Sequence, residues 1–78
     1  MYVKFVEHDS SVEVVECMRV RVLPGYANET AKRDPVAMGM MFEMQKIDGR
    51  LYERIATEGN VYLMNDDGKT IDMFDLDR

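Results

Sequence analysis

Hydrophobic and polar residues alternate along most of residues 38–76, and three short glycine-containing turns interrupt this alternation. The turns are Asp48-Gly49, Gly59-Asn60 and Asp67-Gly68. Such dipeptides are typical of β-hairpins, because their residues tolerate the positive φ angles of tight turns. The pattern therefore predicts a C-terminal meander of four antiparallel strands.

Two-residue loops fix which residues face each other across the strands, so the three turns can be compared. They align one apolar row across all four strands, followed by a second row on the same face: Phe42, Ile55, Met64 and Ile71, then Met40, Thr57, Tyr62 and Met73. We expect this face to form the core. The opposite face pairs Glu43 with Arg54, yet it also holds several apolar residues: Met41, Val61, Leu63, Phe74 and Leu76. Either the sheet curls and covers that face with the N-terminal half, or a partner covers it.

The first part of the chain also favours strands. Tyr2 to Glu7 alternates, and a polar turn follows it. Val12 to Leu23 is rich in β-branched valines, which lose side-chain freedom in helices, and Glu16 interrupts its alternation. We expect a strand with a bulge or bend there. A helix is the alternative, because Ser10 and Glu13 have the spacing of a capping box.

Residues 24–47 leave a second choice open. Pro24-Gly25 ends the preceding element, and the polar stretch after it is the best candidate for a functional loop, with Tyr26, Lys32 and Arg33 as its ligand-facing side chains. Asp34 followed by Pro35 is typical of a helix start, so a helix over 35–47 is conceivable. Gly39 and the hairpin register favour a strand instead.

These elements predict a mainly β fold, in a single domain covering residues 1–78. We expect a small curled antiparallel sheet or a partly open barrel of about six strands, including the four-stranded meander. The alternative is an α+β fold with a helix at about 35–47. With 78 residues the core is small, so self-association, for example as a homodimer, would add stability.

Charge and cysteine content narrow the classes of function. The net charge is −5, and the acidic excess lies in the second half of the chain, which disfavours nucleic-acid binding. A single cysteine, Cys17, excludes an intrachain disulfide and indicates a reducing compartment. The N-terminal residues lack the apolar region of a signal peptide, so we expect a cytoplasmic protein without a membrane segment.

No pattern of catalytic or cofactor-binding residues is recognisable. Gly68-Lys69-Thr70 lacks the upstream glycine of a phosphate-binding loop, since Leu63 stands there. His8, Asp9 and Ser10 are adjacent in the chain and cannot converge as a catalytic triad. The acidic residues near Gly68 do not have calcium-loop spacing, and one histidine with one cysteine is too few for a zinc site. We therefore expect no catalytic residue, no metal, no cofactor and no enzyme activity.

The leading hypothesis is a small acidic protein that binds a protein partner with a basic surface, for instance as an inhibitor of a nucleic-acid-handling protein. Short acidic chains of this type are common among phage and mobile-element accessory proteins. The candidate partner-binding residues lie near the C-terminus: Asp66, Asp67, Asp72, Phe74, Asp75, Leu76 and Asp77. The alternatives are a self-associating structural protein and a nucleic-acid module that uses Arg19, Arg21, Lys32 and Arg33.

Overall fold

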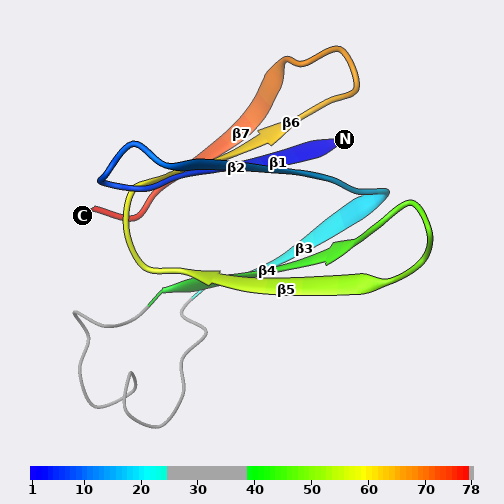
Figure 1. Cartoon of the computed structure of the whole chain (residues 1–78), viewed down its shortest axis with the longest axis horizontal. Helices are drawn as coiled ribbons and strands as arrows, with labels where there is room; N and C mark the ends of the chain where they lie inside the picture. Colours follow the sequence, from blue (N-terminus) through cyan, green and yellow to red (C-terminus); the bar gives the residue numbers. More distant parts are fainter. Residues whose placement is uncertain (25–38, 78) are drawn as a thin grey trace, which may run out of the picture.

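The computed structural model describes residues 1–24 and 39–77, which form seven antiparallel strands in two sheets (Figure 1). The strands are β1 (Tyr2–Val6), β2 (Val12–Glu16), β3 (Arg19–Pro24), β4 (Met40–Gln45), β5 (Leu51–Ala56), β6 (Asn60–Met64) and β7 (Thr70–Asp75). The four-stranded sheet has the order β2-β1-β6-β7, and the three-stranded sheet has the order β3-β4-β5. The prediction of an antiparallel β protein is confirmed. Over the described residues the strands form two facing layers rather than one curled sheet or a closed barrel.

The helical alternatives are wrong wherever the structure describes the chain. Residues 12–16 and 19–24 are both strands, and so are residues 40–45. The interruption expected at Glu16 is a change of sheet, because β2 belongs to the four-stranded sheet and β3 to the three-stranded one. Cys17 and Met18 make this corner: the Cys17 amide donates to the Met1 carbonyl, and the Met18 amide donates to the Gln45 carbonyl.

The predicted C-terminal meander is wrong in its second turn. Gly59-Asn60 does not close a hairpin, since β5 ends in one sheet and β6 pairs with β1 in the other. Gly59 has a φ of 76°, and a Cβ atom there would lie 1.9 Å from the Val6 carbonyl oxygen. The glycine is therefore needed for close approach to β1, and the chain crosses between the sheets at this point.

The other two turns are hairpins, but each loop has three residues instead of two. The Lys46 amide donates to the Arg50 carbonyl and the Gly49 amide donates to the Lys46 carbonyl, with Gly49 at a φ of 88°. This is the pattern of a turn closed by a glycine in the left-handed conformation. The register of β4 and β5 therefore shifts by one residue, so that Phe42 opposes Arg54 and Ile55 opposes Met41. The expected Phe42–Ile55 and Glu43–Arg54 pairs are wrong.

The Asp67-Gly68 hairpin has the same three-residue loop, and a β-bulge near Met64 then reverses the shift. Beyond the bulge, the predicted Tyr62–Met73 pair is confirmed, and Val61–Phe74 and Leu63–Asp72 pair in the same register. The predicted Met64–Ile71 pair is wrong, because Met64 opposes Thr70.

The core lies between the two sheets. It includes buried residues of both layers: Val3, Phe5, Val15, Cys17, Phe42, Met44, Ala56, Val61 and Leu63. Phe42 packs edge-to-face on Phe5 and on Phe74. On β6 and β7 the buried face is therefore the one that holds Val61, Leu63 and Phe74, which the sequence pattern had placed opposite the core. The predicted core face is wrong there and on β5, since Ile55 is 51% exposed and Ile71 61% exposed.

Candidate functional site

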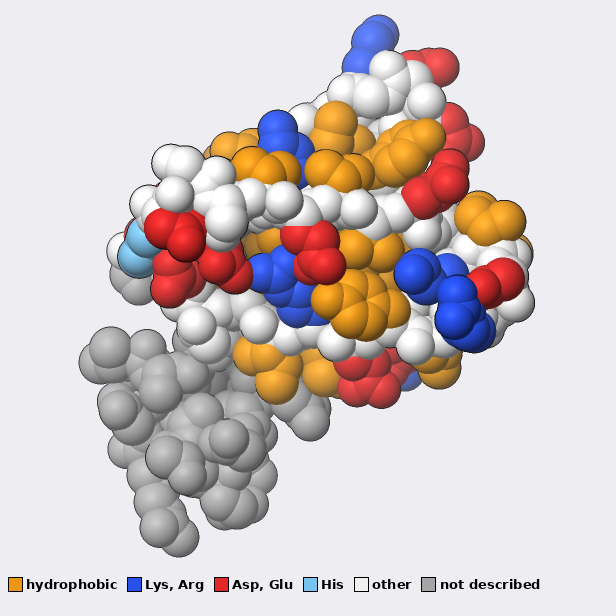
Figure 2. Space-filling model, in the orientation of Figure 1, with side chains coloured by type: hydrophobic (Ala, Val, Ile, Leu, Met, Phe, Trp, Pro, Cys, Tyr) orange, Lys and Arg blue, Asp and Glu red, His pale blue; other side chains and the backbone are white. Residues whose placement is uncertain are grey.

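The outer face of the four-stranded sheet is apolar and exposed. Strand register places Val14, Lys4, Tyr62 and Met73 in one row across all four strands. Val14 is 55% exposed and Met73 49% exposed. Val12 and Ile71, on the two edge strands, are also more than half exposed. Figure 2 shows hydrophobic side chains gathered along this side of the molecule. We call Val12, Val14, Tyr62, Ile71 and Met73 the apolar face.

The outer face of the three-stranded sheet has a different composition. Its middle row is Arg21, Glu43 and Glu53, all of them charged. The Arg19 side chain donates from Nε to the Gln45 amide oxygen at 2.8 Å, on the same side. Exposed apolar residues occur there at both ends of β5, namely Leu51 and Ile55. The middle row of the outer face is therefore charged on the three-stranded sheet and mostly apolar on the four-stranded sheet.

Acidic residues lie at two opposite corners of the apolar face and in the turn beside it. Glu16 ends β2, Asp75 ends β7 at the diagonally opposite corner, and Asp66 and Asp67 lie in the β6–β7 turn. All four are exposed. The N-terminal ammonium group lies 2.5 Å from the Asp66 carboxylate, and this hydrogen bond raises the pKa of the amino group above its usual value of 8.0. Lys4 is the cation within the face, with its Nζ 5.6 Å from the centre of the Tyr62 ring.

The structure divides six of the seven partner-binding residues predicted near the C-terminus into two groups. Asp66, Asp67, Asp72 and Asp75 have exposed side chains. Phe74 and Leu76 are partly buried and pack against the core, so they are used within the molecule. The loop candidates Tyr26, Lys32 and Arg33 lie outside the described residues. Of the predicted basic patch, Arg19 and Arg21 are exposed on the three-stranded sheet.

Asp77 belongs to a small cluster of charges that joins three parts of the chain. Its Oδ1 accepts hydrogen bonds from the His8 ring and from the Gly59 amide. His8 Nδ1 also lies 3.3 Å from the Glu58 carboxylate. The hydrogen bond with Asp77 raises the pKa of His8 above 6.5, and the Gly59 amide, followed by His8, lowers the pKa of Asp77. The cluster attaches the C-terminal segment to the β1–β2 turn and the β5–β6 connection.

A second cluster lies between the sheets at their β2 and β5 edges. The Arg54 guanidinium carbon is 4.2 Å from the centre of the Phe5 ring, and Nη2 lies 2.6 Å from the Glu7 carboxylate. Nη1 donates to Glu13, whose carboxylate also accepts from the Tyr52 hydroxyl at 3.3 Å. The sequence pattern missed this cluster, because the expected register put Arg54 beside Glu43 on a solvated face.

The remaining chemistry of the described residues is sparse. No group of three His, Cys, Asp or Glu side chains in residues 1–24 and 39–77 could hold a metal ion. The Cys17 thiol is fully buried, and burial raises its pKa. The same residues contain no helix long and apolar enough to cross a membrane.

Comparison with known proteins adds no relative: no protein-family model, curated protein or solved structure matches this chain.

Proposed function

We propose that this protein is a non-enzymatic binding protein whose apolar face contacts a protein partner with a basic surface. The observation that carries the proposal is the apolar face itself: large hydrophobic side chains, about half exposed or more, on both edge strands of one sheet, β2 and β7. Exposed apolar patches bordered by polar residues are typical of interaction sites.

The charge around the apolar face argues for a basic partner. Glu16, Asp66, Asp67 and Asp75 border it, while Lys4 is the cation within it. An acidic border steers a positively charged partner and repels a second copy of a chain whose net charge is −5. A basic partner is therefore favoured over self-association. Inhibition of a protein that handles nucleic acid is one role that fits, because such proteins present basic surfaces.

Self-association is the second candidate, because the same apolar face would also serve a homodimer. Burial of a fully exposed Val or Met side chain contributes about 1.5–3 kcal/mol, and the Val and Met side chains of the apolar face, already about half buried, would contribute roughly half of that. A nucleic-acid role has less support, since Arg21 lies in one row with Glu43 and Glu53.

Site-specific photo-cross-linking in the native cells tests the proposal. A photoreactive amino acid replaces Val14 or Met73 on the apolar face, and Leu51, with an exposed fraction of 62%, provides the matched control on the other sheet. We expect a protein adduct from positions 14 and 73 that is absent at position 51. The identified partner, once purified, should bind the Val14→Gln variant at least about tenfold more weakly than the wild type, a difference of about 1.4 kcal/mol.

Three results would count against a basic protein partner. Equal adducts from all three positions would mean that the apolar face is not specific. An adduct only with the chain itself, together with a dimeric mass by light scattering, would assign the face to self-association. If affinity for the partner is unchanged in high salt, which screens exposed charges, the acidic border does not contribute to binding. Unchanged affinity after Asp67→Lys would lead to the same conclusion.

A further inference from the structure

The structure also points to a second surface, and we infer that the outer edge of β2 binds an extended, basic peptide segment as an added strand. The inference rests on the backbone of β2 and on the groove beside it, and it does not require the apolar face to bind the partner proposed above. The segment would extend the four-stranded sheet by one strand, a known mode of peptide recognition.

Within the part of the chain that the structure describes, one side of the β2 backbone pairs with no strand. Met1 and Cys17 exchange two backbone hydrogen bonds, and the Glu7 amide donates to the Ser11 carbonyl. Because antiparallel pairs alternate between bonded and non-bonded positions, Val3–Val15 and Phe5–Glu13 are the bonded pairs between them. The amides and carbonyls of Val12, Val14 and Glu16 therefore point away from β1. Among the described strands, none pairs with that side of β2.

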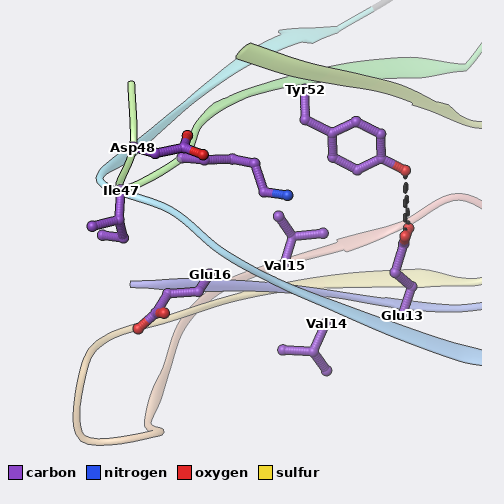
Figure 3. Close-up of a pocket in the computed structure, with 8 residues that line it drawn as sticks. Glu13, Val14, Val15, Glu16, Ile47, Asp48 and Tyr52 are labelled. Atoms are coloured by element: carbon purple, nitrogen blue, oxygen red, sulfur yellow. Dashed lines mark hydrogen bonds between the residues drawn. The ribbon is translucent and has the colours of Figure 1, made fainter. Parts of the chain in front are cut away.

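A groove with a volume of about 590 Å³ lies beside this edge (Figure 3). β2 forms one wall, and the β4–β5 hairpin contributes Lys46, Ile47, Asp48 and Tyr52 to the other. Figure 3 shows the Tyr52 ring over the groove, with its hydroxyl hydrogen-bonded to Glu13. Ile47 is 62% exposed at the hairpin tip. An added strand would place alternate side chains between the two sheets, against Ile47 and Tyr52.

Among the charged residues that line the groove, Glu16 argues for a basic residue in the bound segment. Three of its lining residues are acidic, namely Glu13, Glu16 and Asp48, and one is basic, Lys46. Arg54 already pairs with Glu13, and Arg50 pairs with Asp48. Glu16 lies on the free edge, where a Lys or Arg of the added strand would oppose it. A second copy of β2 would instead bring Glu13 and Glu16 of its own to the same groove, which disfavours self-pairing.

The test uses a capped synthetic peptide containing Lys-Val-Val-Thr-Val, designed to run antiparallel to β2 with its lysine opposite Glu16. Titration to millimolar peptide is followed by amide NMR of the intact protein. We expect saturable shifts at Val12, Val14 and Glu16, and slowing of hydrogen exchange at these three amides by about tenfold or more. The amides of Glu13 and Val15, already bonded to β1, should change little.

Backbone-modified peptides and two protein variants provide the controls. N-methylation of the peptide residue opposite Val14 removes a donor that points at β2 and should abolish binding, whereas N-methylation of the residue opposite Val15 should be tolerated. Val14→Pro removes the outward amide, and an edge strand accepts proline at such a position. This variant should keep a dispersed spectrum but lose binding by at least about tenfold, while Val14→Ala should lose less than about threefold.

Absence of shifts at millimolar peptide, or equal binding of both N-methylated peptides, would overturn the inference. So would slow exchange at Val12, Val14 and Glu16 that depends on protein concentration without peptide, because the edge would then pair with a second copy. Failure of the photo-cross-linking experiment leaves these readouts unchanged, so the two proposals fail separately.

Discussion

The guanidinium of Arg54 stacks on the ring of Phe5, 4.2 Å from its centre, and so joins the two sheets through a charge. Only 20% of the Arg54 side chain is exposed, and both Glu7 and Glu13 bind it. The two carboxylates come from either side of the β1–β2 turn, whereas Arg54 comes from β5. This contact closes the gap between the layers next to the open groove.

Replacement of Arg54 should therefore weaken the packing of the two sheets. We expect Arg54→Ala to lower the free energy of unfolding by about 2–3 kcal/mol, because it removes charge-assisted hydrogen bonds and a cation–π contact. Urea unfolding measures the change. Arg54→Lys keeps the charge but loses the two-sided geometry, so its cost should lie between that of alanine and zero. A cost below about 0.5 kcal/mol for Arg54→Ala would show that the cluster is a surface ion pair without structural weight.

The His8–Asp77 contact predicts a pH dependence of stability. The pKa of His8 is raised in the folded state by Asp77, so its stabilising contribution is complete below about pH 6.5 and is lost as the pH rises through the folded-state pKa. The wild type should therefore have a higher urea midpoint at about pH 5.5 than at about pH 7.5. His8→Gln should remove most of this difference. An equal difference in the variant would assign the dependence to other groups.

Acidification tests the opposite partner of the same contact. The pKa of Asp77 is lowered by the Gly59 amide and by His8, so its contribution is complete above about pH 4 and is lost as the pH falls through the folded-state pKa. In Asp77→Asn the loss of stability on acidification should be smaller than in the wild type. The Gly59 amide donates to the Asp77 carboxylate, so its chemical shift in a two-dimensional NMR pH titration should follow the protonation of Asp77. A Gly59 shift that does not follow this titration would contradict the assignment.

Among the glycines that the structure describes, Gly59 tolerates a side chain least. A Cβ atom there would lie 1.9 Å from the Val6 carbonyl oxygen, and φ is 76°. Gly59→Ala should cost more than about 3 kcal/mol, since backbone strain of about 1–2 kcal/mol adds to a clash that only a shift of β1 or β6 relieves. Gly68→Ala is the matched control: φ is 81°, and nothing lies within 4 Å of its Cβ. Gly68→Ala should lower the free energy of unfolding only by the backbone strain. Equal losses for Gly59→Ala and Gly68→Ala would contradict the close approach of Gly59 to Val6.

Local turn chemistry predicted the strands and their limits well, but it predicted their partners poorly. Asp48-Gly49 and Asp67-Gly68 do close hairpins, yet either a two-residue or a three-residue loop accepts a glycine at positive φ, and the difference of one residue reverses the buried face. The bulge near Met64 then restored part of the expected pairing. At Gly59 the chain could either close a hairpin with β5 or cross to the other sheet. The close approach of Gly59 to Val6, which is distant in sequence, goes with the crossing.

The sequence pattern assigned Tyr62, Ile71 and Met73 of the apolar face to the core, whereas Ile71 and Met73 are about half exposed or more. With valine, isoleucine and methionine on both faces of several strands, periodicity could not say which face was buried. The contact of Arg54 with Glu7, Glu13 and Phe5 depends on the stacking of two sheets, and no local pattern encodes it. The packing of Phe74 on Phe42 likewise required the fold.

Cys17 gives a probe of how the two sheets separate. Its thiol is fully buried at the corner between β2 and β3, and burial raises its pKa above 9.0. A thiol reagent should therefore react in native conditions only through opening, at a rate that follows the free energy of unfolding across the variants described above. Cys17→Ala should cost about 1 kcal/mol, and Cys17→Ser about 1–3 kcal/mol, because the hydroxyl would be buried among apolar side chains. Rapid labelling that Arg54→Ala and Gly59→Ala leave unchanged would show that the corner opens without separation of the sheets.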